Sequence, residues 1–211
     1  MNKLIELPSE WCGESPFFLE GAILAANFSP KPLDPDLWLP SILSVDDIQQ
    51  VSLSDKRLVL DRLEVQYQHL LRSEYVFSDM IGFELDAKAN DDLADAAEGF
   101  MTVWPVVEAH WAEVSVSDGS MRMLSALLTT LMLAIDEQQT QQQMHDAGIE
   151  SAPSLTDMLP QVDSMVTEVA LAADEALLGA KAQAVNPYKG ISRNDKCPCE
   201  SGKKFKQCCG K

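Results

Sequence analysis

Basic side chains are scarce in this chain of 211 residues. It carries 16 lysines and arginines against 33 aspartates and glutamates, which gives a formal net charge of −17. Such an acidic surface argues against general nucleic-acid binding by most of the protein. The cations are also unevenly spread, because residues 186–211 hold seven of them and only two acidic residues. This tail has a net charge of +5 and the preceding residues have −22, so we expect the two segments to do different work.

Long hydrophobic runs are missing as well. The longest apolar stretch without a charge is Met123–Ile135, with 13 residues, and a transmembrane helix needs about 20. The N-terminal sequence MNKLIELPSEWCGESPFF lacks the basic region and apolar segment of a secretory signal. We therefore expect a soluble cytoplasmic protein with no membrane span. In that reducing compartment its five cysteines are expected to bind metal or stay free, and not to form disulfides.

Histidine is rare, and no catalytic set is apparent. The chain has three histidines, each in a different predicted helix and without the spacing of paired ligands: His69, His110 and His145. Asp91, Asp92 and Asp95 can in principle hold a metal, but acidic residues at a helix start explain them more simply. We therefore predict that the protein is not an enzyme. The alternative is a second metal site in the helical body, in an enzyme or a metal-handling protein.

The sequence of the body predicts an all-α bundle of about six helices with short connections. Apolar residues recur at helical spacing over 17–28, from Ser52 to 71, from Asp91 to 111 and from Met121 to about 143. A last helix is expected from Pro160, fading between 179 and 185. The prolines between 30 and 40 predict an extended or turned segment whose Trp38 and Leu39 pack back on the core. We predict an acidic helical domain at 1–179, a linker at 180–192 and a metal-binding motif at 193–211.

Two of these helices have a predicted core-facing side. In the helix after Ser52, whose hydroxyl can cap it, the inward side is expected to carry Leu60, Leu63, Tyr67, Leu70 and Leu71. In the helix from Asp91, it is expected to carry Phe100, Val103, Trp104, Val107 and Trp111.

Part of the body resembles a known family. The matching segments are Phe18-Leu19-Glu20-Gly21, Ser29-Pro30, Asp34-Pro35-Asp36-Leu37-Trp38-Leu39 and Glu98-Gly99-Phe100-Met101 with the later Trp111. They are similar to the YecA/YgfB-like family of bacterial proteins over roughly residues 15–140. The chain departs from that family at Ala96, where an aromatic residue is expected, and at Pro105 inside the helix. The resemblance implies an all-helical fold and no established enzymatic activity, and Gly21 and Gly99 are expected to be close-packing points between helices.

Four cysteines fall within thirteen residues of the tail: Cys197, Cys199, Cys208 and Cys209. Ser201-Gly202 lies between the two pairs, where a turn can bring them together. Four thiolates make a closed tetrahedral zinc site, which leaves no open position for a substrate. Iron is the alternative metal. Disulfides are the other alternative, and pairing within either close pair would strain the chain.

The tail resembles the SEC-C motif, named for the zinc-binding C-terminus of the export ATPase SecA. It keeps the motif residues Arg193-Asn194-Asp195, Cys197-Pro198-Cys199, Ser201-Gly202-Lys203-Lys204-Phe205-Lys206 and Cys208-Cys209. It departs from the motif at Ser192, Lys196 and Glu200, where Glu200 replaces a glycine. In SecA the corresponding tail binds the chaperone SecB and associates with the ribosome.

By this resemblance, the partner-facing side chains would be Arg193, Lys203, Lys204, Phe205 and Lys206. For Phe205 the first expectation is that it fills the small hydrophobic centre of the knuckle, and contact with a partner is the second. Cations beside a metal-thiolate centre suit an acidic protein face or RNA phosphates. The sequence therefore predicts a non-enzymatic, zinc-binding adaptor whose knuckle binds a protein or ribosomal partner in export, chaperoning or translation. Weak, exchangeable metal binding would instead favour a metal-handling protein, and steeply salt-dependent binding by the tail alone would favour a nucleic-acid ligand.

Overall fold

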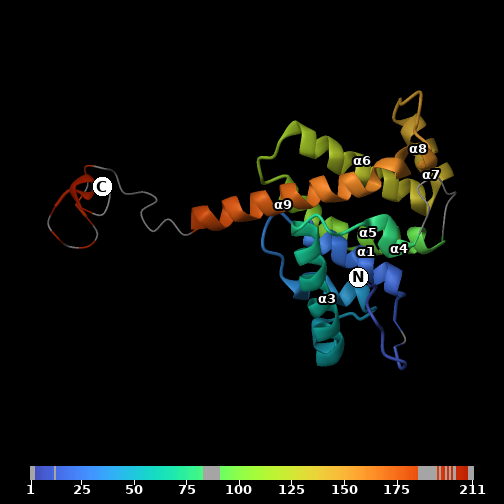
Figure 1. Ribbon diagram of the computed structural model, residues 1–211, viewed down its shortest axis with the longest axis horizontal. Coiled ribbons are helices and arrows are strands. Elements are labelled where there is room, and N and C mark those ends of the chain that lie inside the picture. Colours follow the sequence, from blue (N-terminus) through green and yellow to red (C-terminus); the bar gives the residue numbers. More distant parts are fainter. Residues whose placement is uncertain are drawn as a thin grey trace. The chain divides into compact units, whose positions relative to one another are not determined.

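The structure is a computed structural model that describes residues 3–11, 13–82 and 91–184, then 194, 196, 197, 199, 201 and 203–208. It divides into two units, Met1–Leu177 and Leu178–Lys211, which are described separately below. The helices are α1 (Pro16–Asn27), α2 (Leu39–Ile42), α3 (Leu53–Leu71), α4 (Phe77–Ile81), α5 (Asp91–Trp111), α6 (Asp118–Ile135), α7 (Glu137–Asp146), α8 (Leu155–Met158) and α9 (Val162–Ala184). The short 3₁₀ helices are η1 (Pro35–Leu37), η2 (Ile48–Gln50), η3 (Leu159–Gln161) and η4 (Phe205–Gln207). No strand occurs among the described residues, so the all-α prediction is confirmed (Figure 1).

Helices α1 and α5 form the centre of the first unit, and two glycines let them touch. A Cβ atom at Gly21 of α1 would lie 1.8 Å from the carbonyl oxygen of Ala96 in α5. A Cβ atom at Gly99 of α5 would lie 1.9 Å from the carbonyl oxygen of Phe18 in α1. Each backbone therefore occupies the space where the other helix would carry a side chain, which confirms the predicted close packing.

Replacing Gly21 by alanine is expected to destabilise this unit by about 1–3 kcal/mol or more, because the two backbones must separate to admit the methyl group. The matched control is Gly179→Ala: Gly179 also lies in a helix, but a Cβ atom there would meet nothing within 4 Å. That change should leave stability unchanged or raise it slightly, since alanine favours helix. Urea unfolding followed by circular dichroism measures both. Equal midpoints for Gly21→Ala and the parent chain would refute the close contact.

The two central helices are also joined at their C-terminal ends. The indole Nε1 of Trp111 donates to the carbonyl oxygen of Phe28 at 3.0 Å, and Ser29 Oγ lies 2.8 Å from His110 Nδ1. The ring of Phe100 meets Phe28 edge-on, with 5.8 Å between the ring centroids. Every residue of the predicted inward side of α5 is buried, so that prediction is confirmed.

The predicted inward side of α3 is only partly confirmed. The fully buried residues of the helix are Val59, Arg62, Gln66 and Leu70. The other predicted residues, Leu60, Leu63, Tyr67 and Leu71, are half-buried, and Leu63 packs against the core. The helix is rotated toward α1 because Arg62 and Gln66 have a buried partner there, the carboxylate of Glu20. A pattern of apolar residues cannot indicate a helix face whose central side chains are polar.

The side chain of Glu20 is fully buried and satisfied by three neighbours. Arg62 Nη2 donates to Glu20 Oε1 at 2.6 Å, and Arg62 Nε donates to Oε2 at 2.9 Å. Gln66 Nε2 and the Tyr75 hydroxyl each donate to Oε1 at 2.9 Å. Burial and the neighbouring Glu20 carboxylate raise the pKa of Tyr75 well above its usual value. This buried network fixes how α3 and the segment after it lie against α1.

The helix predicted over 121–143 is two helices. Asp136 has φ −151° and ψ 97°, which ends α6, and its side chain accepts from Gln139 N to cap α7. An aspartate at this position favours a cap over a continuous helix. Two other predictions are confirmed: Ser52 caps α3, and Trp38 and Leu39 are buried in the core.

Helix α9 is tied to the body through polar side chains. The hydroxyl of Tyr67 in α3 donates to Asp174 Oδ1 at 2.6 Å, and burial together with this bond raises the pKa of Tyr67 to about 12. Ser78 of α4 donates to Asp163 through its backbone nitrogen and its hydroxyl, at 2.9 and 2.6 Å. Among the described helices, none is long and apolar enough to cross a membrane. The predicted boundaries at 179 and 192 stay predictions, and 185–192 lies outside the described residues.

Candidate metal centre

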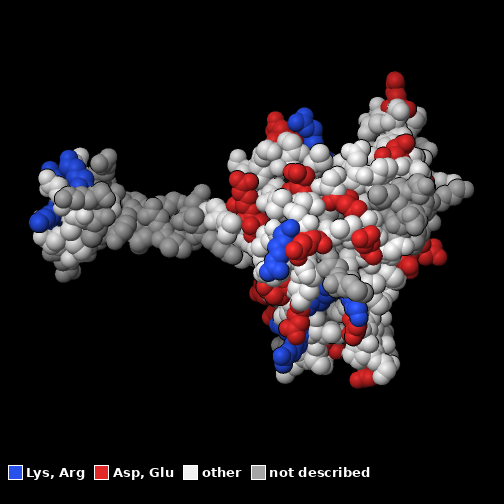
Figure 2. All heavy atoms as spheres, viewed as in Figure 1, with Lys and Arg blue, Asp and Glu red and all other residues white. Residues whose placement is uncertain are grey.

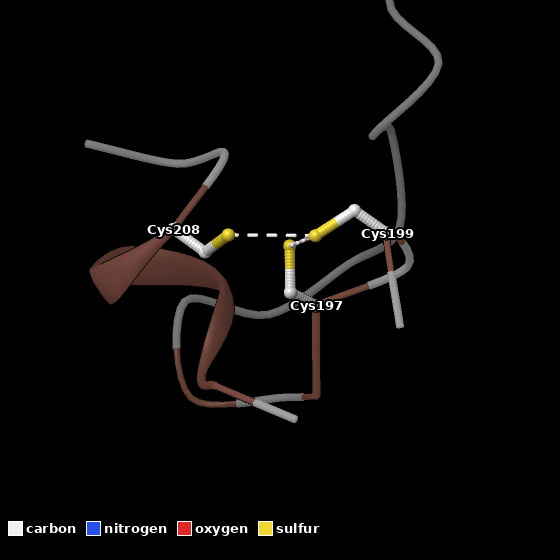
Figure 3. Close-up of side chains that lie close together, drawn as sticks. All are labelled: Cys197, Cys199 and Cys208. Carbon is white, nitrogen blue, oxygen red and sulfur yellow. Dashed lines mark hydrogen bonds between the residues drawn. The ribbon is translucent and has the colours of Figure 1, made fainter. Parts of the chain in front are cut away.

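The C-terminal unit brings three of the four predicted metal ligands together by folding the chain back on itself. Lys196 and Lys204 form an isolated antiparallel bridge, and Cys197 N donates to Lys203 O at 2.8 Å. The turn between them contains Ser201, as the sequence predicted. The 3₁₀ helix η4 then returns the chain, so that Cys208 reaches the side of the turn that carries Cys197 and Cys199 (Figure 3).

The three sulfur atoms converge. Cys199 Sγ lies 3.3 Å from Cys197 Sγ and 3.4 Å from Cys208 Sγ, and all three lie within 4.8 Å of one another (Figure 3). A disulfide would place two sulfurs about 2.05 Å apart, so these three described cysteines form no disulfide with one another. The alternative prediction of disulfides is therefore wrong for these three cysteines.

The spacing of the sulfurs fits a thiolate metal site. Four sulfurs about 2.3 Å from a tetrahedral zinc ion would lie about 3.8 Å from each other. The observed sulfur–sulfur distances of 3.3 and 3.4 Å therefore need only a small expansion to accept an ion. The fourth predicted ligand, Cys209, lies outside the described residues.

Ser201 prepares the site electrostatically. Its Oγ atom lies 3.2 Å from both Cys199 Sγ and Cys208 Sγ. The hydrogen bond with Ser201, followed by that with Cys197, lowers the pKa of Cys199 to about 6. Because metal ions bind the thiolate, this environment favours the metal-binding form of the side chain. The sequence predicted Ser201 only as a turn residue. Its position between the two cysteine pairs was the one feature that could have indicated hydrogen bonds with their sulfur atoms.

The structure describes four of the five predicted partner-facing residues, and the three lysines among them lie on the surface of the same unit. Lys203, Lys204 and Lys206 are exposed, and Phe205 is half-buried beside them. Cys197, in contrast, is only 4% exposed. Arg193 lies outside the described residues. Acidic side chains are spread over the visible face of the helical unit, whereas the coloured side chains of the C-terminal unit are basic (Figure 2). Whether the lysines bind a partner stays a prediction.

The acidic cluster at the start of α5 does not form a comparable centre. Asp91, Asp92, Asp95 and Glu98 line a shallow depression of about 330 Å³. In the described part of the chain, however, the only group of three metal-type side chains whose ligand atoms converge is the cysteine set. Asp95 instead accepts a hydrogen bond from Ser15, the residue that caps α1. The histidines lie apart in α3, α5 and α7, as predicted.

Comparison with known proteins identifies the C-terminal segment. Residues 193–211 match the family model described as the SEC-C motif. A 25-residue stretch is 72% identical to the protein translocase subunit SecA of Anaplasma marginale, covering 12% of this chain and 3% of that protein. Longer matches are 36% identical over 92 residues to SecA of Coxiella burnetii, covering 42% of this chain and 9% of that protein, and 30% over 140 residues to SecA of Anaplasma phagocytophilum, covering 60% and 16%.

The chain thus spans at most 16% of the length of these three relatives. No solved structure matches it. The tail carries a SEC-C motif, and its three described cysteines are gathered as a metal site of that type requires.

Proposed function

We propose that this protein is a cytoplasmic adaptor without catalytic activity, in which a zinc-bound SEC-C knuckle binds a partner. The observation that carries the proposal is the convergence of three cysteine sulfurs inside a motif shared with SecA. With Cys209 as the fourth ligand, the site would be closed, and a closed thiolate site holds structure without offering a position for substrate. Zinc is proposed over iron because a structural role requires no redox change.

The knuckle also supplies the means of binding. Lys203, Lys204 and Lys206 are exposed on a turn of few residues, so their charges lie close together beside the cysteines. A partner with an acidic face, such as an export chaperone of the SecB kind, matches this surface. Ribosomal RNA phosphates match it as well, although binding to them should weaken more steeply with salt. The YecA/YgfB resemblance of the body stays part of this proposal, as a scaffold that the knuckle brings to its partner.

Affinity capture tests the proposal. The full-length, zinc-loaded chain and a Lys203→Gln/Lys204→Gln/Lys206→Gln variant are each incubated with purified SecB and with ribosomes. We expect the parent chain to retain one of the two and the variant to retain at least tenfold less, since three cationic contacts are lost. A matched control, Lys3→Gln/Lys56→Gln/Arg57→Gln, changes the net charge equally within the helical unit. Equal retention of SecB or ribosomes by the parent chain and by the lysine variant would overturn the adaptor assignment. So would the failure of the parent chain to retain either of them.

Metal content separates the adaptor from the alternative. One tightly held zinc ion per purified chain, with no second metal, is the expected result. A second, readily exchanged ion lost on Asp91→Asn/Asp92→Asn would instead support a metal site in the helical body.

A further inference from the structure

A groove of about 930 Å³ opens on the helical unit. It lies between the N-terminal residues 8–11, 13 and 14, the loop 43–45 after α2, and the segment 50–58 that leads into α3. None of these segments belongs to the cysteine site. The volume lies at the upper end of the usual range of ligand sites, about 300–1,000 Å³.

One part of the groove wall is apolar, and polar residues line the rest. Trp11, Leu43, Val45, Val51 and Leu58 line the apolar part, and each of them is half-buried. The indole of Trp11 is held in place, because its Nε1 donates to the carbonyl oxygen of Glu14 at 2.8 Å. A fixed aromatic ring with neighbouring aliphatic side chains is a surface on which an apolar side chain of a ligand can rest at little entropic cost.

The charges at the groove have one sign. Glu10, Glu14 and Asp55 line it, and none of the lysines or arginines that the structure describes does. Lys56, next to Asp55 in sequence, pairs instead with Asp36 at 2.6 Å. Glu14 accepts a hydrogen bond from Ser44 Oγ at 3.2 Å, which orients its carboxylate without neutralising it. The groove therefore combines a partly apolar wall with net negative charge.

We propose that this groove binds a cationic peptide segment of a partner protein, one in which apolar side chains alternate with lysine or arginine. Apolar side chains of such a segment rest on Trp11 and Leu58, while its flanking cations lie near Glu14 and Asp55. An anionic or nucleic-acid ligand would be repelled by the same carboxylates. The inference goes beyond the adaptor proposal, since it gives the helical body its own ligand.

The protein carries its own reporter for this event. It has four tryptophans, and the other three, Trp38, Trp104 and Trp111, are at most 4% exposed. Only Trp11 is thus open to collision with a quencher such as acrylamide. A ligand in the groove must shield it.

The experiment titrates full-length, metal-loaded protein with the peptide acetyl-Lys-Leu-Lys-Leu-Lys-amide and follows acrylamide quenching of tryptophan fluorescence. We expect saturable protection that weakens with added salt and vanishes in Trp11→Phe. Glu14→Gln/Asp55→Asn should weaken the affinity about tenfold, because two partly shielded ion pairs are lost. The control Glu108→Gln/Glu150→Gln, which alters exposed acids elsewhere by the same charge, should bind as the parent chain does.

Three outcomes would overturn the inference. The first is no protection at millimolar peptide. The second is equal protection by the glutamate peptide acetyl-Glu-Leu-Glu-Leu-Glu-amide or by its glutamine counterpart, which would make the groove a site for apolar peptides or small molecules of any charge. The third is undiminished affinity in Glu14→Gln/Asp55→Asn, with the fold of the variant verified by circular dichroism. None of these results bears on capture through the knuckle, so the two proposals fail separately.

Discussion

Cys199→Ser is expected to remove the bound zinc and unfold the C-terminal knuckle while the helical body keeps its stability. Structural zinc supplies about 10–16 kcal/mol of folding free energy in small zinc-binding peptides. The described knuckle residues offer only one isolated bridge and one 3₁₀ turn in its place. Cys199 is also the sulfur that contacts both of the others, at 3.3 and 3.4 Å. Its loss therefore removes the centre of the site.

Three measurements on the purified variant check this result: zinc content, limited proteolysis of the tail, and thermal unfolding of the body. We expect zinc to fall from one ion per chain to nearly none, and the tail to be cut rapidly. The unfolding midpoint of the body should shift by less than about 2 °C, since the two units are separate compact parts. Cys12→Ser, which changes the one cysteine outside the motif, is the matched control and should keep its zinc. A Cys199→Ser chain with full zinc and a resistant tail would refute the site.

Glu20→Gln is expected to be the most damaging single change in the helical body. The substitution keeps the shape but removes the charge that faces the guanidinium of Arg62, and Arg62 is only 8% exposed. Breaking a buried ion pair by removing one partner costs about 3–5 kcal/mol, because the remaining charge stays buried without compensation. The amide also has one acceptor oxygen in place of two, so its NH2 group faces a donor: Arg62 Nε if the oxygen stays toward Gln66 and Tyr75. Urea unfolding should therefore show a much lower midpoint.

A double variant distinguishes a lost ion pair from a general packing defect. Glu20→Leu/Arg62→Leu removes both charges and should recover much of the stability lost in Glu20→Gln, as expected for a buried pair replaced by apolar groups. The contrasting control is Glu113→Gln, which breaks the 2.5 Å pair with Lys31 at a site where the Glu113 side chain is 62% exposed. That change should lower the urea midpoint far less than Glu20→Gln does, because an ion pair with an exposed side chain contributes little to stability. Equal losses of stability in Glu20→Gln and Glu113→Gln would show that burial of an ion pair does not determine the stability lost when the pair is broken.

The cysteine site could be predicted because its information is local. The ligand types, their spacing and the turn at Ser201 all lie within a few residues, and metal binding needs little else. The helices were predictable for a related reason: apolar spacing and capping residues such as Ser52 act over a few turns. The contact of Gly21 with α5 could also be anticipated, since a glycine inside a helix needs a packing reason.

The remaining features depend on distant residues. Arg62 and Gln66 look like surface side chains until Glu20, more than forty residues earlier, is placed against them. The break at Asp136 was missed because the apolar run before it continues into a glutamine-rich segment of good helix formers, and one cap outweighed that propensity. The acidic groove joins Trp11 and Glu14 to lining residues between 43 and 58, which are distant from them in sequence, so no local pattern could reveal it.

The close approaches at Gly21 and Gly99 restrict which substitutions the fold accepts. Neither position can accept even a methyl group while the other helix stays in place. A chain in which α1 packs on α5 in this way therefore needs both glycines, whereas its exposed positions carry no such restriction. We expect two glycines about eighty positions apart, the first preceded by the acidic residue that binds Arg62, to recur wherever two helices pack in this way.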